Sequence, residues 1–144
     1  MKIIRKIFIF IFILVLASCK KDEIISSLAS TNWLFIGIHK NDNNVDEKVP
    51  SEFREMTLEF TDTNILYALS VCNSINGKYH LLGNDSLKVD DLITTLVYCG
   101  DGNPHTWDEL YYNGLRNATN YFLKDNTLTI KTSINIDLIF KLKN

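Results

Sequence analysis

The sequence predicts a mainly β fold, an antiparallel barrel-like sheet with one helix that packs on the barrel or plugs its end. One observation is a series of short apolar or alternating segments, separated by turns rich in Gly, Asn and Asp, from residue 31 onward. The other is a single amphipathic run near residues 107–115 with helical spacing. Because closure removes exposed sheet edges, seven to nine short strands favour an antiparallel barrel or sandwich.

The strand predictions follow from apolar runs and period-2 alternation. Residues 33–39 form a dense apolar run that predicts a buried strand, and Met56, Leu58 and Phe60 alternate with polar residues. Turns are expected at 41–44, 61–64, 83–85 and 124–126, where Asn, Asp and Gly cluster. The predicted strands are 33–39, 56–60, 65–71, 77–81, 87–89, 93–98, 121–123, 128–130 and 134–142.

One helix is predicted after a loop at Gly100–Pro104. Thr106 and Glu109 fit a capping box, in which the two side chains satisfy each other's backbone donors at a helix start. Trp107, Leu110, Tyr111 and Leu115 then follow helical spacing. The pair Asp108-Glu109 is therefore interpreted as part of the first helical turn, and the pair Asp90-Asp91 as a turn.

The first 18 residues predict an export signal. Met1–Lys6 is basic, and Ile7–Leu16 is an apolar run of ten residues, whereas a membrane-spanning helix needs about 20. Leu16-Ala17-Ser18-Cys19 resembles the bacterial lipobox, so we expect cleavage before Cys19 and acylation of that residue. An ordinary secretory signal with a spare thiol is the alternative. The predicted organisation is signal peptide 1–18, lipidated tether 19–30 and domain 31–144.

The residues after the lipobox predict outer-membrane sorting. Lys20 and Lys21 follow the cysteine, and nothing there resembles an acidic inner-membrane retention signal; either face of the membrane is possible. Of 15 basic and 17 acidic residues, three basic ones lie in the leader, which leaves 12 and 17 and a net charge of −5. This balance argues against nucleic acid as a partner, because phosphate neutralisation needs clustered Lys and Arg.

With Cys19 acylated, Cys72 and Cys99 are the remaining cysteines. An oxidising compartment then predicts a disulfide that closes a loop of 26 intervening residues and stabilises the fold by about 3 to 4 kcal/mol. Two buried free thiols are the alternative. We expect no metal site, because the sequence offers too few Cys or His ligands at a recognised spacing.

The sequence predicts no enzyme and no cofactor. His39, His80 and His105 are the only histidines, and none is placed as the partner of a nucleophile. Asn73 and Thr95 are interpreted as buried hydrogen-bonding groups around the disulfide, with the alternative that they line a site. A further set of aromatic residues is interpreted as core rather than ligand pocket: Trp33, Trp107, Tyr111, Phe122 and Phe140.

Several landmarks together resemble the META domain family of small bacterial envelope lipoproteins, which includes the HslJ heat-shock-inducible proteins. They are Trp33, Cys72-Asn73, Gly77-Lys78-Tyr79, Thr95 before Cys99, Glu109 with Leu115, and a hairpin from Tyr121 through Leu128 to Phe140. The sequence departs from the family pattern in an insertion at Asn41–Glu55 and in Val71. The resemblance implies an antiparallel barrel-like fold with a helix, and links to envelope stress, drug tolerance, and motility or secretion.

The functional prediction is a non-enzymatic, lipid-anchored envelope protein, monomeric, that contributes to stress tolerance through contacts with other envelope proteins. One alternative is a lipocalin-like barrel that encloses a small apolar ligand or lipid. Another is an inhibitor or periplasmic binding module that acts on proteases.

Overall fold

The computed structural model describes residues 28–143 and confirms the predicted mainly β fold. Its elements are, in order, β1 (Thr31–Lys40), β2 (Val45–Lys48), β3 (Thr57–Phe60), β4 (Ile65–Leu69), β5 (Ser74–Leu81), β6 (Leu87–Thr94), α2 (Asn103–Arg116), β7 (Ala118–Lys124), β8 (Thr127–Thr132) and β9 (Ile136–Leu142).

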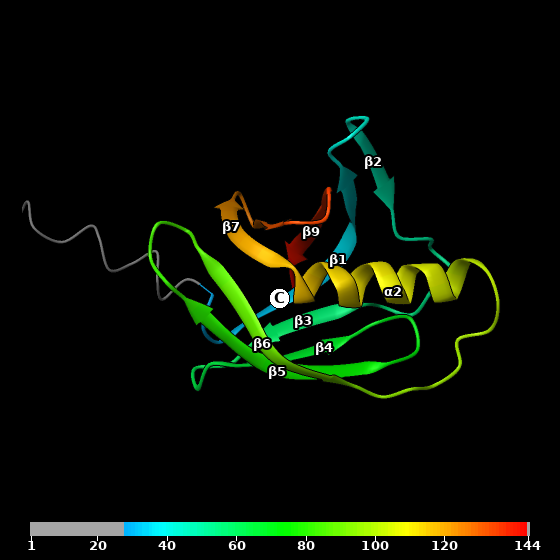
Figure 1. Cartoon of the computed structure of the whole chain (residues 1–144), viewed down its shortest axis with the longest axis horizontal. Coiled ribbons are helices and arrows are strands. Elements are labelled where there is room, and N and C mark those ends of the chain that lie inside the picture. Colours follow the sequence, from blue (N-terminus) through cyan, green and yellow to red (C-terminus); the bar gives the residue numbers. More distant parts are fainter. Residues whose placement is uncertain (1–27, 144) are drawn as a thin grey trace, which may run out of the picture.

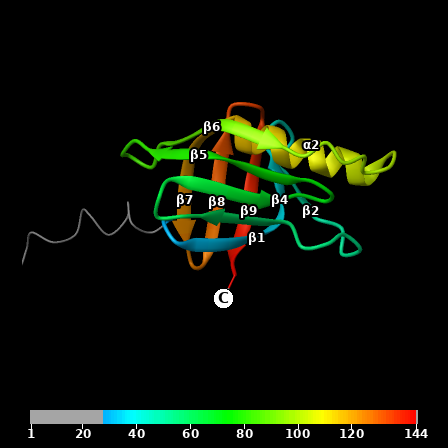
Figure 2. The same cartoon turned by 90° about the horizontal axis from the view of Figure 1, so that it is seen from below.

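The strands form one antiparallel sheet in the order β6-β5-β4-β3-β1-β9-β8-β7, with β2 paired to β1. The sheet curls so that β7, β8 and β9 cross the direction of β3–β6 (Figure 2). Its two edge strands meet at one end, where Ser86 and Asn120 form an isolated bridge and the Tyr121 N–H donates to the Asp85 carbonyl at 2.8 Å. The sheet is therefore a half-barrel, open along most of the boundary between β6 and β7.

Helix α2 packs on the concave side of the sheet, above β3–β6 in Figure 1. It buries Trp107, Tyr111 and Leu115, which confirms the helical spacing that predicted it. The Tyr111 ring lies 4.7 Å from that of Phe35 on β1, which lies 5.2 Å from that of Phe140 on β9. Because these rings join α2 to β1 and β9, the helix forms part of the core.

The buried hydroxyl of Tyr111 should make the stability of the fold depend on pH at high pH. Burial raises the pKa of its hydroxyl well above the usual 10, and the hydroxyl donates to the Thr57 carbonyl at 2.8 Å. The unfolded chain ionises Tyr near pH 10 while the folded chain retains the proton, so this contribution is present below about pH 10 and is lost above it. From about pH 9 to about 11, the free energy of unfolding should therefore fall less steeply with pH in Tyr111→Phe than in the wild type, as measured by urea unfolding at each pH. The same slope in the Tyr111→Phe variant and the wild type would contradict the assignment, and exposed Tyr67→Phe is the control.

The packed unit includes residues that the sequence assigned to the tether. Leu28 is fully buried in the core, and its carbonyl accepts a hydrogen bond from the Thr31 hydroxyl. That hydroxyl in turn accepts the indole N–H of Trp33 at 2.7 Å. These contacts fix the entry of the chain into β1 and shorten the segment that separates the domain from Cys19, which lies outside the described residues.

The predicted capping box is wrong. Helix α2 begins at Asn103, with Gly102 before it at φ 85°, and no side chain caps its start. Pro104 occupies the first turn, where a backbone N–H has no helical partner to lose. Thr106 lies one turn into the helix and its hydroxyl donates to the Gly102 carbonyl at 3.2 Å. Glu109 lies in the second turn rather than the first.

Two predictions around β6 are also wrong. The segment 93–98 is not a strand throughout, because β6 ends at Thr94. Asp90 and Asp91 do not form a turn but lie within β6, where a register shift against β5 accommodates Asp91 at φ 52°. The ammonium of Lys78 donates to Asp91 at 2.9 Å and lowers the pKa of that carboxyl. The shifted register explains why an acidic pair that suggests a turn is compatible with a strand.

Two further differences concern the surface. The insertion at 41–55 contains β2, whose backbone passes so close to Gly37 of β1 that a Cβ there would meet the Glu47 carbonyl. Phe122, expected in the core, is half exposed, because it lies on the outward side of β7 while its neighbour Tyr121 points inward.

Candidate functional site

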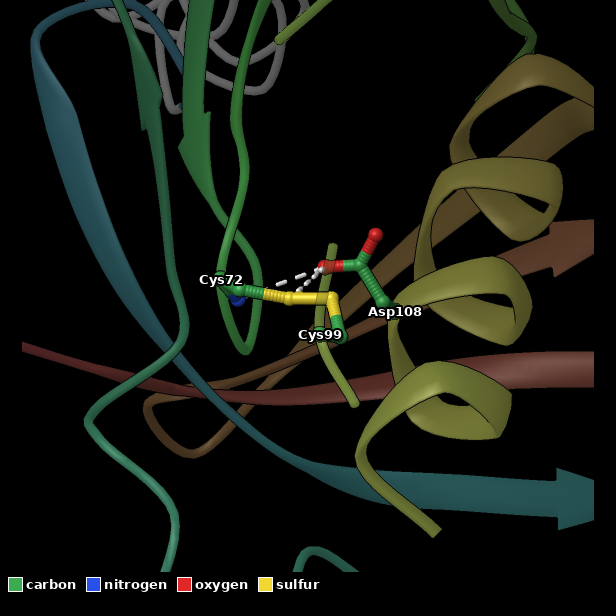
Figure 3. Close-up of side chains that lie close together, drawn as sticks. All are labelled: Cys72, Cys99 and Asp108. Carbon is green, nitrogen blue, oxygen red and sulfur yellow. Dashed lines mark hydrogen bonds between the residues drawn. A yellow bond between two sulfur atoms is a disulfide. The ribbon is translucent and has the colours of Figure 1, made fainter. Parts of the chain in front are cut away.

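The candidate site is centred on a disulfide between Cys72 and Cys99, whose Cα atoms lie 5.7 Å apart. It ties the turn between β4 and β5 to the segment that leads into α2. Both residues are half-buried, and Asp108 projects toward them from α2 (Figure 3). Three separate parts of the chain therefore meet at this point.

The carboxylate of Asp108 is held against the disulfide by hydrogen bonds. One oxygen accepts the hydroxyl of Ser70 and lies 3.6 Å from the sulfur of Cys72, and the other accepts the side-chain amide of Asn73 at 2.9 Å. Sequence reasoning had assigned Asp108 only a favourable charge in the first helical turn, whereas it lies in the second turn and faces the disulfide. No local pattern marks it, because these partners are 35 and 38 residues away.

Asn73 connects the disulfide to the segment before α2. Its side-chain oxygen accepts the hydroxyl of Thr95 at 2.9 Å and the backbone N–H of Val97 at 2.8 Å. Thr95 is itself exposed, and its hydroxyl also accepts the Ser74 N–H at 3.1 Å. The buried side chain of Asn73 thus fixes the backbone of this segment, as interstrand hydrogen bonds fix a strand.

The turn that carries Cys72 is closed by its own residues and by one arginine. The hydroxyl of buried Ser70 accepts the Asn73 N–H at 3.0 Å, and the Ser70 N–H donates to the Asn73 carbonyl at 2.9 Å. Arg54 donates to the carbonyls of Ser70 and Asn73 at 2.8 and 3.1 Å. Neither Ser70 nor Arg54 was identified from the sequence, since Arg54 binds only backbone carbonyls and the side-chain partner of Ser70, Asp108, is 38 residues away.

Asn73→Ala is expected to lower the free energy of unfolding by about 1 to 3 kcal/mol. In this variant the Val97 N–H loses its acceptor, and the Asp108 carboxylate loses one of its donors. Urea unfolding measures this loss, and amide exchange should accelerate at Val97. Asn76→Ala, at an exposed asparagine on β5 three residues further along the chain, is the control. Equal effects of the two substitutions would contradict this role of Asn73.

Next to the disulfide, the 93–98 segment exposes four apolar side chains. The exposed fractions are 69% for Ile93, 94% for Leu96, 56% for Val97 and 74% for Tyr98. A short segment that exposes several large apolar side chains is a candidate interaction site.

A groove of about 470 Å³ separates this segment from α2. Leu96, Val97 and Tyr98 line one side, and Asp108 and Glu109 belong to the other. The described residues that line the groove include no Lys or Arg, so the groove is apolar on one side and carries two carboxylates on the other, together with His105.

The remaining sequence-predicted residues lie apart from the disulfide. Trp33, Tyr79 and Leu115 are buried in the core, where the Tyr79 hydroxyl donates to the Thr61 carbonyl at 2.6 Å. Gly77 lies against β6, at the register shift, where a Cβ would meet the Asp90 carbonyl. Glu109 is exposed and pairs with His105 at 3.4 Å.

The other two histidines also pair with carboxylates. His39 lies 2.6 Å from Asp46, and His80 lies 3.5 Å from Asp90. These surface pairs are built within or between neighbouring strands and lie on elements other than those that carry the disulfide.

A half-barrel of antiparallel strands with one helix on its concave side, and a disulfide at the base of that helix, defines the class of small mainly β domains to which this protein belongs. The META domain family matches residues 26–144, and the chain is a member of that family.

Solved structures share the fold. An NMR structure of a protein from Burkholderia xenovorans is 21% identical, covers 81% of this chain and 84% of its own, and has a TM-score of 0.67. A crystal structure of a DUF4847 family protein from Bacteroides vulgatus is 15% identical, covers 82% and 96%, and has a TM-score of 0.58. No curated protein matches the chain. Among the described residues, no helix has the length and apolar character to span a membrane.

Proposed function

We propose that this META-domain protein is a lipid-anchored, non-enzymatic protein of the cell envelope, which contributes to stress tolerance by binding other envelope proteins. The observation that carries the proposal is the 93–98 segment, which exposes four apolar side chains, three of them along a groove that also contains Asp108 and Glu109. Burial of such side chains against a partner is favourable by about 25 cal/mol per Å² of apolar surface.

The 93–98 segment is held in one conformation before any partner arrives. Its start pairs with β5, its middle is bound by Asn73, and its end is fixed by the disulfide at Cys99. A rigid segment loses less conformational entropy on binding than a mobile loop, so more of the apolar contact contributes to affinity.

The charges around the groove indicate the chemistry of the partner. Asp108 and Glu109 line it, and the Tyr98 hydroxyl, on the apolar side, donates to Asp101 at 2.6 Å. A protein surface that presents an apolar side chain next to Lys or Arg would fit both sides of the groove.

Site-specific photocrosslinking in intact cells tests the proposal. A crosslinking residue at Leu96 should give a discrete adduct with an envelope protein, and Leu96→Asp should reduce both the adducts formed from Tyr98 and survival under envelope stress. The matched control is Phe122, a half-exposed apolar residue on β7. Adducts of equal yield from Leu96 and Phe122, or none from Leu96, would contradict binding through this segment.

The anchor is proposed from the lipobox pattern at Leu16–Cys19, which lies outside the described residues. Cys19→Ser should abolish the acylated species in mass spectrometry and move the protein from the membrane fraction to the soluble fraction. Lys20→Ser, one residue further on, should leave both unchanged. A Cys19→Ser protein that stays in the membrane fraction and keeps its mass shift would disprove the anchor.

The lipocalin-like alternative needs an apolar interior space. In the described part of the chain, the concave side of the sheet is filled by aromatic and aliphatic side chains and by α2, including Phe35, Tyr111 and Phe140. The packed core therefore gives no structural support to an enclosed ligand. We expect native mass spectrometry to detect no bound molecule.

A further inference from the structure

We propose that the reduced form of Cys72 and Cys99 binds Zn²⁺ together with Asp108. The two sulfurs and a carboxylate oxygen of Asp108 all lie within 4.8 Å of one another, and all three residues are half-buried. Figure 3 shows the carboxylate turned toward the sulfurs from the neighbouring helix. Zn²⁺ binding goes beyond the protein-binding role proposed for the 93–98 segment and can be measured without a partner, although Cys99 and Asp108 also line the groove beside that segment.

The backbone spacing fits a tetrahedral ion. Zn–S bonds of about 2.3 Å in a tetrahedral site place two sulfurs about 3.8 Å apart. With Cα atoms at 5.7 Å, rotation of the two side chains brings the separated sulfurs to that distance without moving the backbone. The Asp108 oxygen, already 3.6 Å from the sulfur of Cys72, lies at the separation expected between two ligands of one ion.

The donor set favours zinc over the other common metals. Two thiolates and one carboxylate combine soft and hard ligands, which suits Zn²⁺ better than the oxygen-preferring Mg²⁺ and Ca²⁺ or the sulfur-preferring Cu⁺. Three protein ligands leave a fourth position for water. A metal site was not expected from the sequence, because too few Cys or His ligands lie at a recognised spacing, and Asp108 joins the two cysteines only in the folded chain.

The carboxylate is already oriented for coordination. The Ser70 hydroxyl and the Asn73 amide hold its two oxygens, and the same Asn73 amide lies 3.9 and 3.7 Å from the sulfurs of Cys72 and Cys99. Hydrogen bonds of this kind around metal ligands fix their orientation and favour the charged forms. The contacts now seen around the disulfide would therefore support the metal-bound form as well.

Oxidation and metal binding are mutually exclusive at this site. In the disulfide, each sulfur is covalently bonded and carries no charge for a metal. An external dithiol must supply two electrons and two protons, breaking the Cys72–Cys99 bond and becoming a disulfide itself. Zn²⁺ then replaces the two thiol protons, which are released to solvent. The site is thus available in newly exported protein before oxidation, or wherever a dithiol reductant keeps the pair open.

Metal titration of the purified mature chain in detergent tests the proposal. After reduction with a phosphine, the protein should bind one Zn²⁺ in competition with a chromophoric chelator. Cd²⁺ should give the ultraviolet charge-transfer band of metal–thiolate bonds. The oxidised protein should show neither. Zn²⁺ should also raise the melting temperature of the reduced protein only.

Two variants separate the ligands from their surroundings. Asp108→Asn should weaken binding at least as much as the loss of an outer-shell partner does, which is about 10- to 100-fold, whereas Asp42→Asn, at an exposed carboxylate on the turn between β1 and β2, should leave it unchanged. Cys72→Ser should abolish tight binding. If reduced wild type binds Zn²⁺ no more tightly than Cys72→Ser, the site does not exist, and if Asp108→Asn binds as wild type does, Asp108 is not a ligand. Even if a variant fails to fold, comparing the Zn²⁺ titrations of reduced and oxidised wild type decides whether the site exists.

Discussion

Replacing Cys72 and Cys99 together by serine is expected to lower the free energy of unfolding by about 3 to 4 kcal/mol. The disulfide closes a loop that contains β5, β6 and the 93–98 segment, with a sequence separation of 27. Without the crosslink the unfolded chain regains the freedom of that loop. Urea unfolding of the double variant measures the loss.

The loss should be concentrated at the end of the loop. Residues 95–99 have no strand partner beyond the Thr95–Ser74 contact and are held by Asn73 and the disulfide. Amide exchange should therefore accelerate there more than in β4. Wild type reduced with a phosphine in the absence of metal is the control and should lose a similar free energy. If the double variant unfolds at the same urea concentration as oxidised wild type, the disulfide contributes nothing to stability.

Phe35→Ala is expected to lower the free energy of unfolding by about 3 to 5 kcal/mol. The Phe35 ring lies 6.1, 4.7 and 5.2 Å from the rings of Trp107, Tyr111 and Phe140, so it contacts both α2 and β9. Its removal leaves a cavity where the helix meets the sheet, and the loss of burial adds to the loss of the aromatic contacts.

The neighbouring residue provides the control for this substitution. Ile36 is on the same strand but points outward and is exposed, so Ile36→Ala should cost less than about 1 kcal/mol. Thermal and urea unfolding of both variants should agree. If Phe35→Ala is no more destabilising than Ile36→Ala, the aromatic cluster does not join α2 to the sheet in the way described.

Much of the fold could be predicted because its signals are local. The alternation at Met56–Phe60 placed β3, and the spacing of Trp107, Tyr111 and Leu115 placed the buried face of α2. The start of the helix could not be predicted, since Thr106 and Glu109 form the same pattern inside a helix as at its beginning. Propensity and spacing describe an element but do not fix which residue begins it.

The candidate site was predicted only in part. Asn73 and Thr95 were interpreted as buried hydrogen-bonding groups around the disulfide; they do bond to each other and Asn73 is buried, but Thr95 is exposed, so burial was predicted wrongly for Thr95. Asp108 and Arg54 could not be identified, because each meets the turn between β4 and β5 only through tertiary packing, and Ser70 lies in that turn but meets Asp108 only in the folded chain. The exposure of Leu96 and Val97 was also missed. A short apolar run predicts a buried strand, and nothing in the sequence shows that this run continues past the end of β6.

The single bridge between Ser86 and Asn120 has a consequence for the order in which the molecule opens. The facing edges of β6 and β7 share no ladder beyond it, while the central pair β1 and β9 is joined along seven residue positions. Local unfolding should therefore begin between β6 and β7, at the ends of these strands that lie away from the Ser86–Asn120 contact. The edge strands β6 and β7 should separate from each other first, while β1 and β9 stay paired.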